Sequence, residues 1–267
     1  MAHAYELGII GAGAMGSALA RGFVAGGAVS CDRVIISDVR DEVRDALAAE
    51  GFAATADNQQ LVDQSATLLL VVKPQVLADV LKPLQIAATQ LVISFAAGVT
   101  LARLTELLGD DRPLIRVMPN ILAVVSEAAS AYAGNAHATA AHLDLAQQLL
   151  CSIGTAVQVE EKLMDAVTGL SGSGPAFVAV FAEAMMDGAV AAGLPRGQAA
   201  LLAAQTIQGV GRWLLQTGQS PAQLKDLVTS PGGTTIAGLR ALEDGGLRSA
   251  VVEAVVAAAE RSRELGK

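Results

Sequence analysis

Three glycines near the start of the chain have the spacing that holds a dinucleotide phosphate. Gly11, Gly13 and Gly16 follow an apolar run over residues 7–10 in the pattern G-x-G-x-x-G, and a helical pattern comes after them. Gly11 would allow the tight turn, Gly13 would let the backbone approach a pyrophosphate, and Gly16 would let the helix pack on the sheet. The pyrophosphate would lie at the helix N-terminus. A glycine-rich turn without a ligand is the alternative at this point.

A second glycine-rich stretch, residues 230–235, has the composition of an anion-binding helix start. Its sequence Ser-Pro-Gly-Gly-Thr-Thr precedes an expected helix over 236–242. Two glycines and two hydroxyls in four residues make a nest that can take a carboxylate. Residues 171–175, Ser-Gly-Ser-Gly-Pro, precede another apolar helix, and we expect both stretches to be helix N-termini with free N–H groups. Plain capping is the alternative reading of both.

Strands must carry these loops, and a β-branched run over 33–37 completes the first β-α-β unit. Asp38 follows that run, 22 residues after Gly16, close to where an acidic residue takes the ribose hydroxyls of a dinucleotide. Ser37 and Arg40 could instead hold a 2′-phosphate, so these residues leave NAD and NADP open. A structural alternative is that Asp38 caps the next helix.

Continuous apolar runs later in the first half predict further strands with both faces covered. We expect these strands over residues 67–72, 90–95, 114–118, 129–133 and 155–159, with a helix over 140–150. Lys73 and Pro74 follow one of them at the edge where such sheets bind ligands, although a solvated lysine is the simpler reading. The alternation predicts an α/β fold with a doubly wound, mostly parallel sheet of the Rossmann type.

After Glu161 only helical patterns remain, which predicts two domains: a dinucleotide-binding domain over residues 1–161 and an all-α domain over 162–267. No charged residue occurs over 166–182, and Arg212 is the one charged residue between 197 and 224. Helices with so little polar face need cover, so we predict a homo-oligomer, at least a dimer. The apolar stretch 176–193 is expected to be a buried helix of a soluble protein.

Charge and composition exclude several classes of function. The 267 residues carry a formal net charge of -8, which argues against a nucleic-acid or membrane partner. Cys31 and Cys151 are far apart and the three histidines form no ligand-spaced cluster, so we expect neither a disulfide nor a metal site. Glu6 and the glycine loop stand where a secretory signal would need a basic start and an apolar run, so a cytoplasmic protein is expected.

Together the motifs resemble those of the pyrroline-5-carboxylate reductases of proline biosynthesis. The matching segments are residues 9–16, 72–75, 96–100, 116–120, 169–176, 225–226 and 230–239. The resemblance implies reduction of 1-pyrroline-5-carboxylate to L-proline, with NADP(H) preferred and NAD(H) the alternative. It also implies a helical C-terminal domain that interlocks two subunits, often within decamers. Ile121 and Leu122 stand where the family has Thr-Pro, so the loop beside the nicotinamide is expected to differ in shape.

The resemblance also assigns roles to individual residues. Thr235 would be catalytic through a hydrogen bond to the ring nitrogen, and the N–H groups of Gly233, Thr234 and Thr235 would hold the substrate carboxylate. The same pocket would be walled by Ser171, Ser173 and Gly174, with Thr168 ordering a water. The cofactor would be contacted by Gly11, Gly13, Ala14, Met15, Gly16, Ser37, Asp38, Arg40, Asn58, Val72, Lys73, Pro74, Ala96, Ala97, Gly98, Met118 and Asn120.

The chemistry agrees with this assignment, because a protonated imine already accepts hydride and mainly needs to be oriented. One rival is a related two-domain dehydrogenase or imine reductase acting on another small acid. The dehydrogenases of this plan use a lysine on the first long C-terminal helix, and no lysine occurs between Lys162 and Lys225. The other rival is a non-catalytic nucleotide-binding oligomer, which would not need the second nest over 230–235.

Overall fold

The computed structural model describes residues 3–266, which form two compact units. The first unit contains residues 3–173 together with 257–266, and the second contains residues 174–256. The last helix of the chain therefore begins in the second unit and ends in the first. The predicted domain boundary after residue 161 stays a prediction, because compactness within one chain does not test which segments fold independently.

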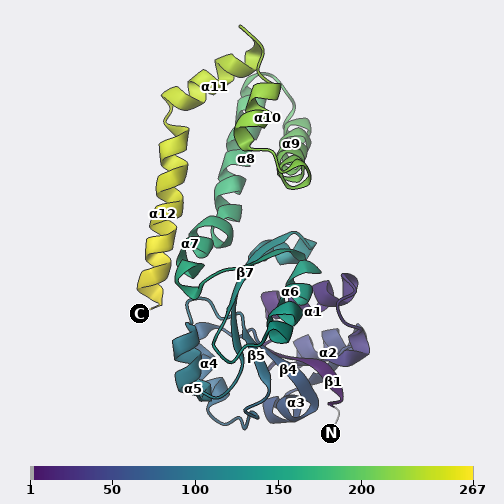
Figure 1. The fold of residues 1–267 in the computed structure, drawn as a ribbon. Coiled ribbons are helices and arrows are strands. Elements are labelled where there is room, and N and C mark those ends of the chain that lie inside the picture. Colours follow the sequence, from purple (N-terminus) through teal and green to yellow (C-terminus); the bar gives the residue numbers. More distant parts are fainter. Residues whose placement is uncertain (1–2, 267) are drawn as a thin grey trace. The chain divides into compact units, whose positions relative to one another are not determined.

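The first unit is built on one eight-stranded sheet with the order β3-β2-β1-β4-β5-β6-β7-β8 (Figure 1). The strands are β1 Tyr5–Ile10, β2 Val34–Ser37, β3 Ala53–Thr55, β4 Ser65–Leu70, β5 Leu91–Ser94, β6 Leu114–Met118, β7 Ala128–Gly134 and β8 Gly154–Gln158. All neighbours are parallel except β6 and β7, which are antiparallel. The predicted doubly wound, mostly parallel sheet is confirmed.

The first unit also contains helices, most of which connect its strands. They are α1 Ala14–Ala25, α2 Asp41–Ala49, α3 Asn58–Gln64, α4 Pro74–Leu81, α5 Leu101–Leu108, α6 Ala140–Cys151 and α7 Met164–Val167, with short 3₁₀ helices at Cys31–Arg33, Ile121–Val125 and Glu161–Leu163 and a π-helical segment at Thr168–Gly172. Side chains fix several starts: Asp57 accepts from two N–H groups of α3, Thr100 caps α5, and Thr139 forms a capping box in α6. The sequence analysis missed β3, which has three residues and no apolar run.

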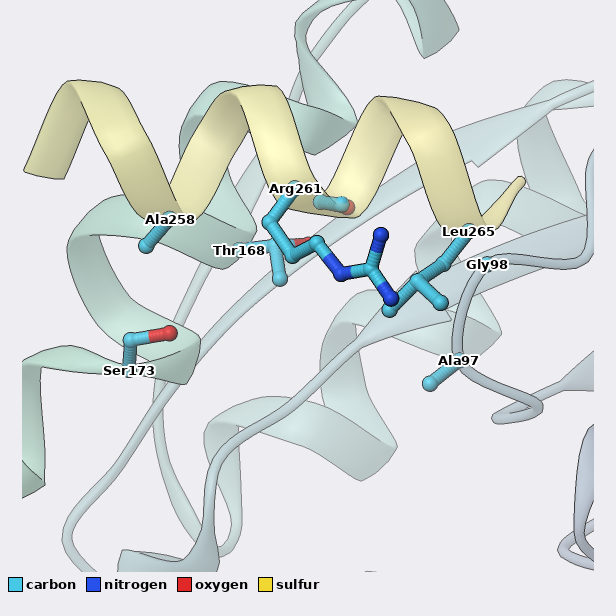
Figure 2. A pocket seen from close by; sticks show the side chains of 8 residues that line it. Ala97, Gly98, Thr168, Ser173, Ala258, Arg261 and Leu265 are labelled. Atoms are coloured by element: carbon cyan, nitrogen blue, oxygen red, sulfur yellow. The ribbon is translucent and has the colours of Figure 1, made fainter. Parts of the chain in front are cut away.

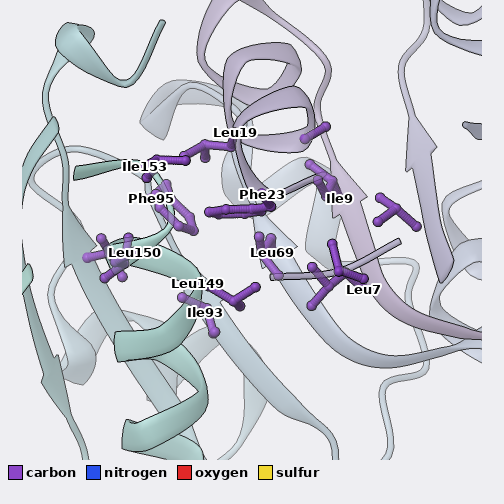
Figure 3. Packing of buried hydrophobic residues seen from close by; sticks show 14 of the residues in the cluster. Leu7, Ile9, Leu19, Phe23, Leu69, Ile93, Phe95, Leu149, Leu150 and Ile153 are labelled. Atoms are coloured by element: carbon purple, nitrogen blue, oxygen red, sulfur yellow. The ribbon is translucent and has the colours of Figure 1, made fainter. Parts of the chain in front are cut away.

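Two hydrophobic clusters lie on the two faces of the sheet. Neighbouring residues on a strand point to opposite faces, so Ile9 joins one cluster and Ile10 the other. Figure 3 shows the first cluster, where Phe23 of α1 lies among strand residues such as Leu69 and residues of α6 such as Leu149. Burial on both faces explains why these strands read as continuous apolar runs.

The second unit is entirely helical. Its elements are α8 Gly174–Ala191, α9 Arg196–Thr217, α10 Pro221–Leu227, α11 Thr234–Asp244 and the first part of α12 Leu247–Leu265. Helices α8 and α9 pack along each other, yet α8 has no buried residue. The expected burial of residues 176–193 is therefore not provided by this single chain. One continuous helical stretch, Glu161–Ala191, is long and apolar enough to span a membrane by length and composition alone.

Candidate active site

The glycine loop follows β1, which has β2 on one side and β4 on the other. The strand order changes direction at this point of the sheet. Gly11 has φ of +101°, a conformation that favours glycine, and its N–H donates to the Ser37 carbonyl at 2.9 Å. A Cβ on Gly11 would lie 2.9 Å from the Val71 carbonyl oxygen, and a Cβ on Gly16 would overlap the Gly11 carbonyl oxygen. Both positions therefore need glycine for the turn and for the close packing of α1.

Gly13 differs from Gly11 and Gly16, because no contact within the protein requires a glycine at this position. It precedes α1 in an extended conformation, and a Cβ there would meet no protein atom within 4 Å. The backbone at Gly13 is thus exposed to open space beside the N–H groups of Ala14 and Met15, which start α1. This cradle fits a pyrophosphate, which needs backbone donors and close approach. A pocket of about 340 Å³ beside it is lined by Ala12, Gly13, Ala14, Ser17, Arg21, Arg40, Glu42, Val43, Ala46 and Leu47.

Asp38 braces the glycine loop and holds Arg40. One carboxylate oxygen accepts from the Ala12 N–H at 3.0 Å, and the other accepts from the backbone N–H and Nε of Arg40, at 3.0 and 2.8 Å. The side chain of Asp38 is 9% exposed and that of Arg40 is 48% exposed. The hydrogen bond from Arg40 is the main cause that lowers the pKa of Asp38 to about 2. The capping alternative is wrong, because Arg40 occupies the N-cap position of α2.

We expect Asp38→Asn to destabilise the protein in a pH-dependent way. A lowered folded-state pKa stabilises the fold above the ordinary value of 3.8 and loses that effect as the pH falls through about 2. The shift corresponds to about 2 kcal/mol at neutral pH. Urea denaturation at pH 7 and pH 2.5 should therefore show a stability gap between wild type and variant that shrinks in acid. Asp41→Asn, at a carboxylate that is 82% exposed, is the control, with about 0.5 kcal/mol or less at both pH values. An equal gap at both pH values for Asp38→Asn would contradict the prediction.

The remaining residues predicted at the dinucleotide crevice lie at the ends of β2 and β4. The Ser37 hydroxyl donates to Oδ1 of Asn58 at 2.6 Å, and Ser37 is 1% exposed, so this hydroxyl is turned into the protein. Lys73 is the N-cap of α4 and Pro74 is its first residue, as the sequence predicts for this edge of the sheet. A Cβ added to Gly11 would lie 2.8 Å from Cγ1 of Val72, so Val72 packs against the glycine loop. The residues predicted to contact the cofactor at Gly11, Asp38, Asn58 and Lys73 thus lie along the same edge of the sheet.

A pocket of about 270 Å³ joins residues that the sequence analysis assigned to cofactor and to substrate (Figure 2). Ala97 and Gly98 line it from the loop after β5, where they follow the buried Ala96. Thr168 lines it from the π-helical segment and Ser173 from the residue directly after that segment. Its other lining residues come from α12: Ala258, Arg261, Ser262 and Leu265. In Figure 2 the side chain of Arg261 extends from α12 toward the Gly98 end of the pocket.

Sequence analysis missed these residues of α12. Their spacing of three, four and seven residues places them on one helix face, which the sequence could have indicated. It could not indicate what that face contacts. In the structure the Ser262 hydroxyl donates to Oδ1 of Asp165 at 2.7 Å, and this hydrogen bond ties the last turns of α12 to α7.

The stretch 171–175 contains the start of α8, as expected from the sequence, but it follows another helical segment and not a free loop. Helix α7 runs into the π-helical segment Thr168–Gly172, and the Ser173 N–H donates to the Thr168 carbonyl at 2.9 Å. The hydroxyls of Thr168 and Ser171 donate to the carbonyls of Met164 and Val167 in the preceding turn. The prediction of free N–H groups here is therefore wrong for Ser173. Gly174 begins α8 just after this segment.

The loop after β6 adjoins the π-helical segment. A Cβ on Gly172 would lie 2.7 Å from Cε of Met118, so the end of β6 packs directly on the segment. Ile121 and Leu122 begin the 3₁₀ helix Ile121–Val125, and the Leu122 N–H donates to Oδ1 of Asn120 at 3.2 Å. A proline at position 122 could not make this bond. The expected difference in loop shape from the family stays a prediction.

The nest over 230–235 lies in the second unit. Gly232 has φ of +66°, and the Gly233 N–H donates to the Ser230 carbonyl at 3.1 Å, which closes a turn with Pro231 at its second position. The Gly233 N–H is therefore occupied, and the expectation that it is free is wrong. Thr234 and Thr235 start α11, and their N–H groups have no acceptor in the described part of the chain. Of the three N–H groups that the sequence predicts as anion donors, these two remain.

Metal ligands do not gather anywhere in residues 3–266: no group of three or more His, Cys, Asp or Glu side chains could hold an ion there. A charged pair at the end of the loop after β5 is structural. Oε1 of Glu161 accepts from Nη1 of the buried Arg116 at 3.1 Å and from the Leu101 N–H, at the start of α5, at 2.6 Å. This pair fixes the end of the loop that carries Ala97 and Gly98.

Comparison with protein-family models gives two matches. Residues 161–265 match the model described as pyrroline-5-carboxylate reductase dimerisation. Residues 6–98 match the model described as NADP oxidoreductase, coenzyme F420-dependent.

Curated proteins and solved structures give matches over nearly the whole chain. A pyrroline-5-carboxylate reductase of Methanosarcina acetivorans is 49% identical over 265 residues, 98% of either chain. One from Glycine max is 47% identical, covering 99% of this chain and 97% of its own. The structure of a Coxiella burnetii pyrroline-5-carboxylate reductase has a TM-score of 0.92 at 32% identity, covering 99% of both chains. The structure of a Plasmodium falciparum pyrroline carboxylate reductase with NADP bound has a TM-score of 0.86 at 30% identity, covering 100% of both chains.

Proposed function

Because the chain belongs to the pyrroline-5-carboxylate reductase family, we propose that it reduces 1-pyrroline-5-carboxylate to L-proline with NADP(H), and that NAD(H) is the alternative cofactor. The observation that carries the proposal is the 49% identity to a reductase of this name over 98% of both chains. The nicotinamide cofactor supplies the hydride. The residues of this chain bind, orient and shield the two reactants.

The glycine loop and the start of α1 are proposed to hold the cofactor pyrophosphate. The open space at Gly13 and the N–H groups of Ala14 and Met15 support this role. At the adenosine end, Asp38 has its oxygens occupied by Ala12 and Arg40, whereas the Arg40 guanidinium is half exposed beside the pocket. We therefore propose that Arg40 contacts a 2′-phosphate and that Asp38 holds Arg40 in place, which favours NADP(H).

The substrate carboxylate is proposed to bind at the start of α11. The N–H groups of Thr234 and Thr235 are donors at a helix N-terminus, which suits the carboxylate of the imine. The Thr235 hydroxyl would hydrogen-bond the ring nitrogen and so keep the protonated imine oriented. Thr168 and Ser173 are proposed to wall the reaction space, since both line the pocket with Ala97 and Gly98.

The decisive assay follows the absorbance of NADPH or NADH with 1-pyrroline-5-carboxylate and, separately, with small keto acids. Turnover of the imine is the expected result. Turnover of keto acids but not of the imine would support the dehydrogenase rival. Absence of turnover with every substrate would support the non-catalytic nucleotide-binding protein.

Thr235→Ala should reduce kcat/KM for the imine by roughly 10- to 100-fold, because a lost hydrogen bond to a charged group is worth about 1.5 to 3 kcal/mol. The dissociation constant of NADPH, measured by fluorescence titration without substrate, should stay within about twofold. Thr235→Ser restores the hydroxyl and should recover most of the activity. Thr206→Ala is the matched control, because that hydroxyl only donates to the Leu202 carbonyl within α9. Full activity of Thr235→Ala would remove Thr235 from the mechanism.

The assembly is proposed to be a homodimer, with a decamer as its larger form, since residues 161–265 match a dimerisation model. The apolar helical stretch Glu161–Ala191 lies within this matched span. We therefore propose that a partner subunit covers it and that it does not cross a membrane. The net charge of -8 supports the absence of a nucleic-acid partner. A cytoplasmic location is proposed, in line with bacterial and archaeal relatives.

A further inference from the structure

A proline removes the α-helical donor of one carbonyl in the segment next to the pocket. In an uninterrupted α-helix the Ser171 carbonyl would accept from the N–H of residue 175, but residue 175 is proline and has no N–H. A proline ring also crowds the carbonyl four residues before it. The chain responds with the π-helical segment Thr168–Gly172, in which the Ser173 N–H reaches the Thr168 carbonyl.

Asn120 replaces the missing donor. Its Nδ2 donates to the Ser171 carbonyl at 3.0 Å, across 51 residues of sequence. Its Oδ1 accepts from the N–H groups of Leu122 at 3.2 Å and Ala129 at 3.4 Å. The residue is 5% exposed, so these bonds are shielded from water. One amide thus joins the loop after β6, the start of β7 and the π-helical segment.

The segment held in this way carries one residue of the pocket in Figure 2, Thr168, and is directly followed by another, Ser173. Thr168 and Ser173 line that pocket opposite Ala97 and Gly98. A rotation of the segment would move both relative to the loop after β5. Misplacement by about 1 Å is enough to slow a reaction about a hundredfold when orientation supplies most of the catalysis.

The geometry points to Asn120 as a positioning residue that holds the π-helical segment in place of the N–H that Pro175 lacks, and not as a cofactor contact. The expected effects on kcat rest on the proposed function. The expected effect on the π-helical segment does not depend on it. Asn120 acts through Ser171 and sets where Thr168 and Ser173 stand when the two reactants meet. The π-helical segment is then a permanent part of the site, maintained by a side chain from the loop after β6.

Asn120→Asp is the first test, because it keeps Oδ1 but replaces the donor with an oxygen that repels the Ser171 carbonyl. We expect kcat to fall by about tenfold or more, with the dissociation constant of NADPH within about twofold of wild type. A direct cofactor contact predicts the opposite split. Wild-type kcat, or a large rise in that dissociation constant, overturns the inference. Asn120→Ala makes the same test without adding a charge if the aspartate variant does not fold.

Pro175→Ala provides a second test, because it returns an N–H to residue 175. In this background the Ser171 carbonyl has a helical donor, so Asn120→Asp should cost kcat about threefold or less. Equal costs of Asn120→Asp in the two backgrounds overturn the inference. This comparison separates a bond to Ser171 from a general effect of the substitution on the fold.

Asn135 offers a matched control at the other end of the same strand pair. Its Oδ1 accepts from the Leu114 N–H at 3.1 Å and its Nδ2 donates to the Arg112 carbonyl at 2.9 Å. Asn135→Asp should lower the Tm, and its kcat should stay within about twofold of the wild-type value.

Hydrogen exchange of the Ser173 amide tests the inference without any substrate. Exchange should be about tenfold faster or more in Asn120→Asp than in wild type, and unchanged in Asn135→Asp. Unchanged exchange at Ser173 in Asn120→Asp overturns the inference. If the wild type fails to reduce the imine, the proposed function fails while this measurement still decides the role of Asn120.

Discussion

Replacing Gly13 with valine should weaken NADPH binding about a hundredfold, which is about 2.7 kcal/mol, while the free energy of unfolding stays nearly unchanged. Gly13 has φ of -63° and ψ of -171°, a conformation that valine adopts readily. A Cβ at this position meets no protein atom within 4 Å, so the fold accepts the side chain. The added methyl groups fill the space that the proposed pyrophosphate needs, next to the start of α1.

The matched variant is Gly16→Ala, which should lose both stability and NADPH binding. Its Cβ would overlap the Gly11 carbonyl oxygen, so the backbone of the loop or of α1 has to shift. Urea denaturation and fluorescence titration with NADPH, carried out on both variants, separate the two roles of glycine in one motif. Wild-type affinity of Gly13→Val for NADPH would show that the pyrophosphate does not approach this part of the loop.

Adding charge to the apolar faces of α8 and α9 should dissociate the assembly. Val180 and Leu202 are 66% and 56% exposed in the single chain, so Val180→Glu with Leu202→Glu places two carboxylates where the subunit itself tolerates them. If a partner subunit covers these faces, each unpaired buried carboxylate costs several kcal/mol, enough to shift a micromolar sample to monomers. Sedimentation velocity should show the change in mass, and activity should fall with it.

Val157→Glu is the control for this experiment. Val157 lies in β8 and is 51% exposed, but it stands outside the residues matched by the dimerisation model. Its sedimentation coefficient is expected to remain that of the wild type. A double variant that still sediments as a dimer would contradict the prediction and place the subunit contact on other surfaces of the helical unit.

The framework of the sheet could be predicted from the sequence because its signals are local. The strand over 114–118 was placed at the residues that form β6, and the predicted helix start at Pro74 is the start of α4. Gly11 was assigned to the tight turn, and its φ of +101° confirms that use. The three-residue β3 was missed, because its order depends on pairing with β2 and not on its own residues.

The site itself depended on contacts that no local pattern contains. The sequence leaves ribose binding open for Asp38, and it does not indicate that the carboxylate oxygens accept from Ala12 and Arg40. The Gly233 N–H was read as free, but it closes a turn on Ser230.

The sequence by itself determined which backbone conformations this chain adopts: where it turns at Gly11, where α1 and α4 start, and where Pro175 denies the helix an N–H. These features follow from single residues and their immediate neighbours. Only the tertiary structure decided which group satisfies the Ser171 carbonyl that Pro175 leaves without an α-helical donor, and it is Asn120, 51 residues away in the loop after β6. The reason is that hydrogen-bond partners distant in sequence are set by which strands and helices become neighbours, and spacing along the chain does not encode that choice.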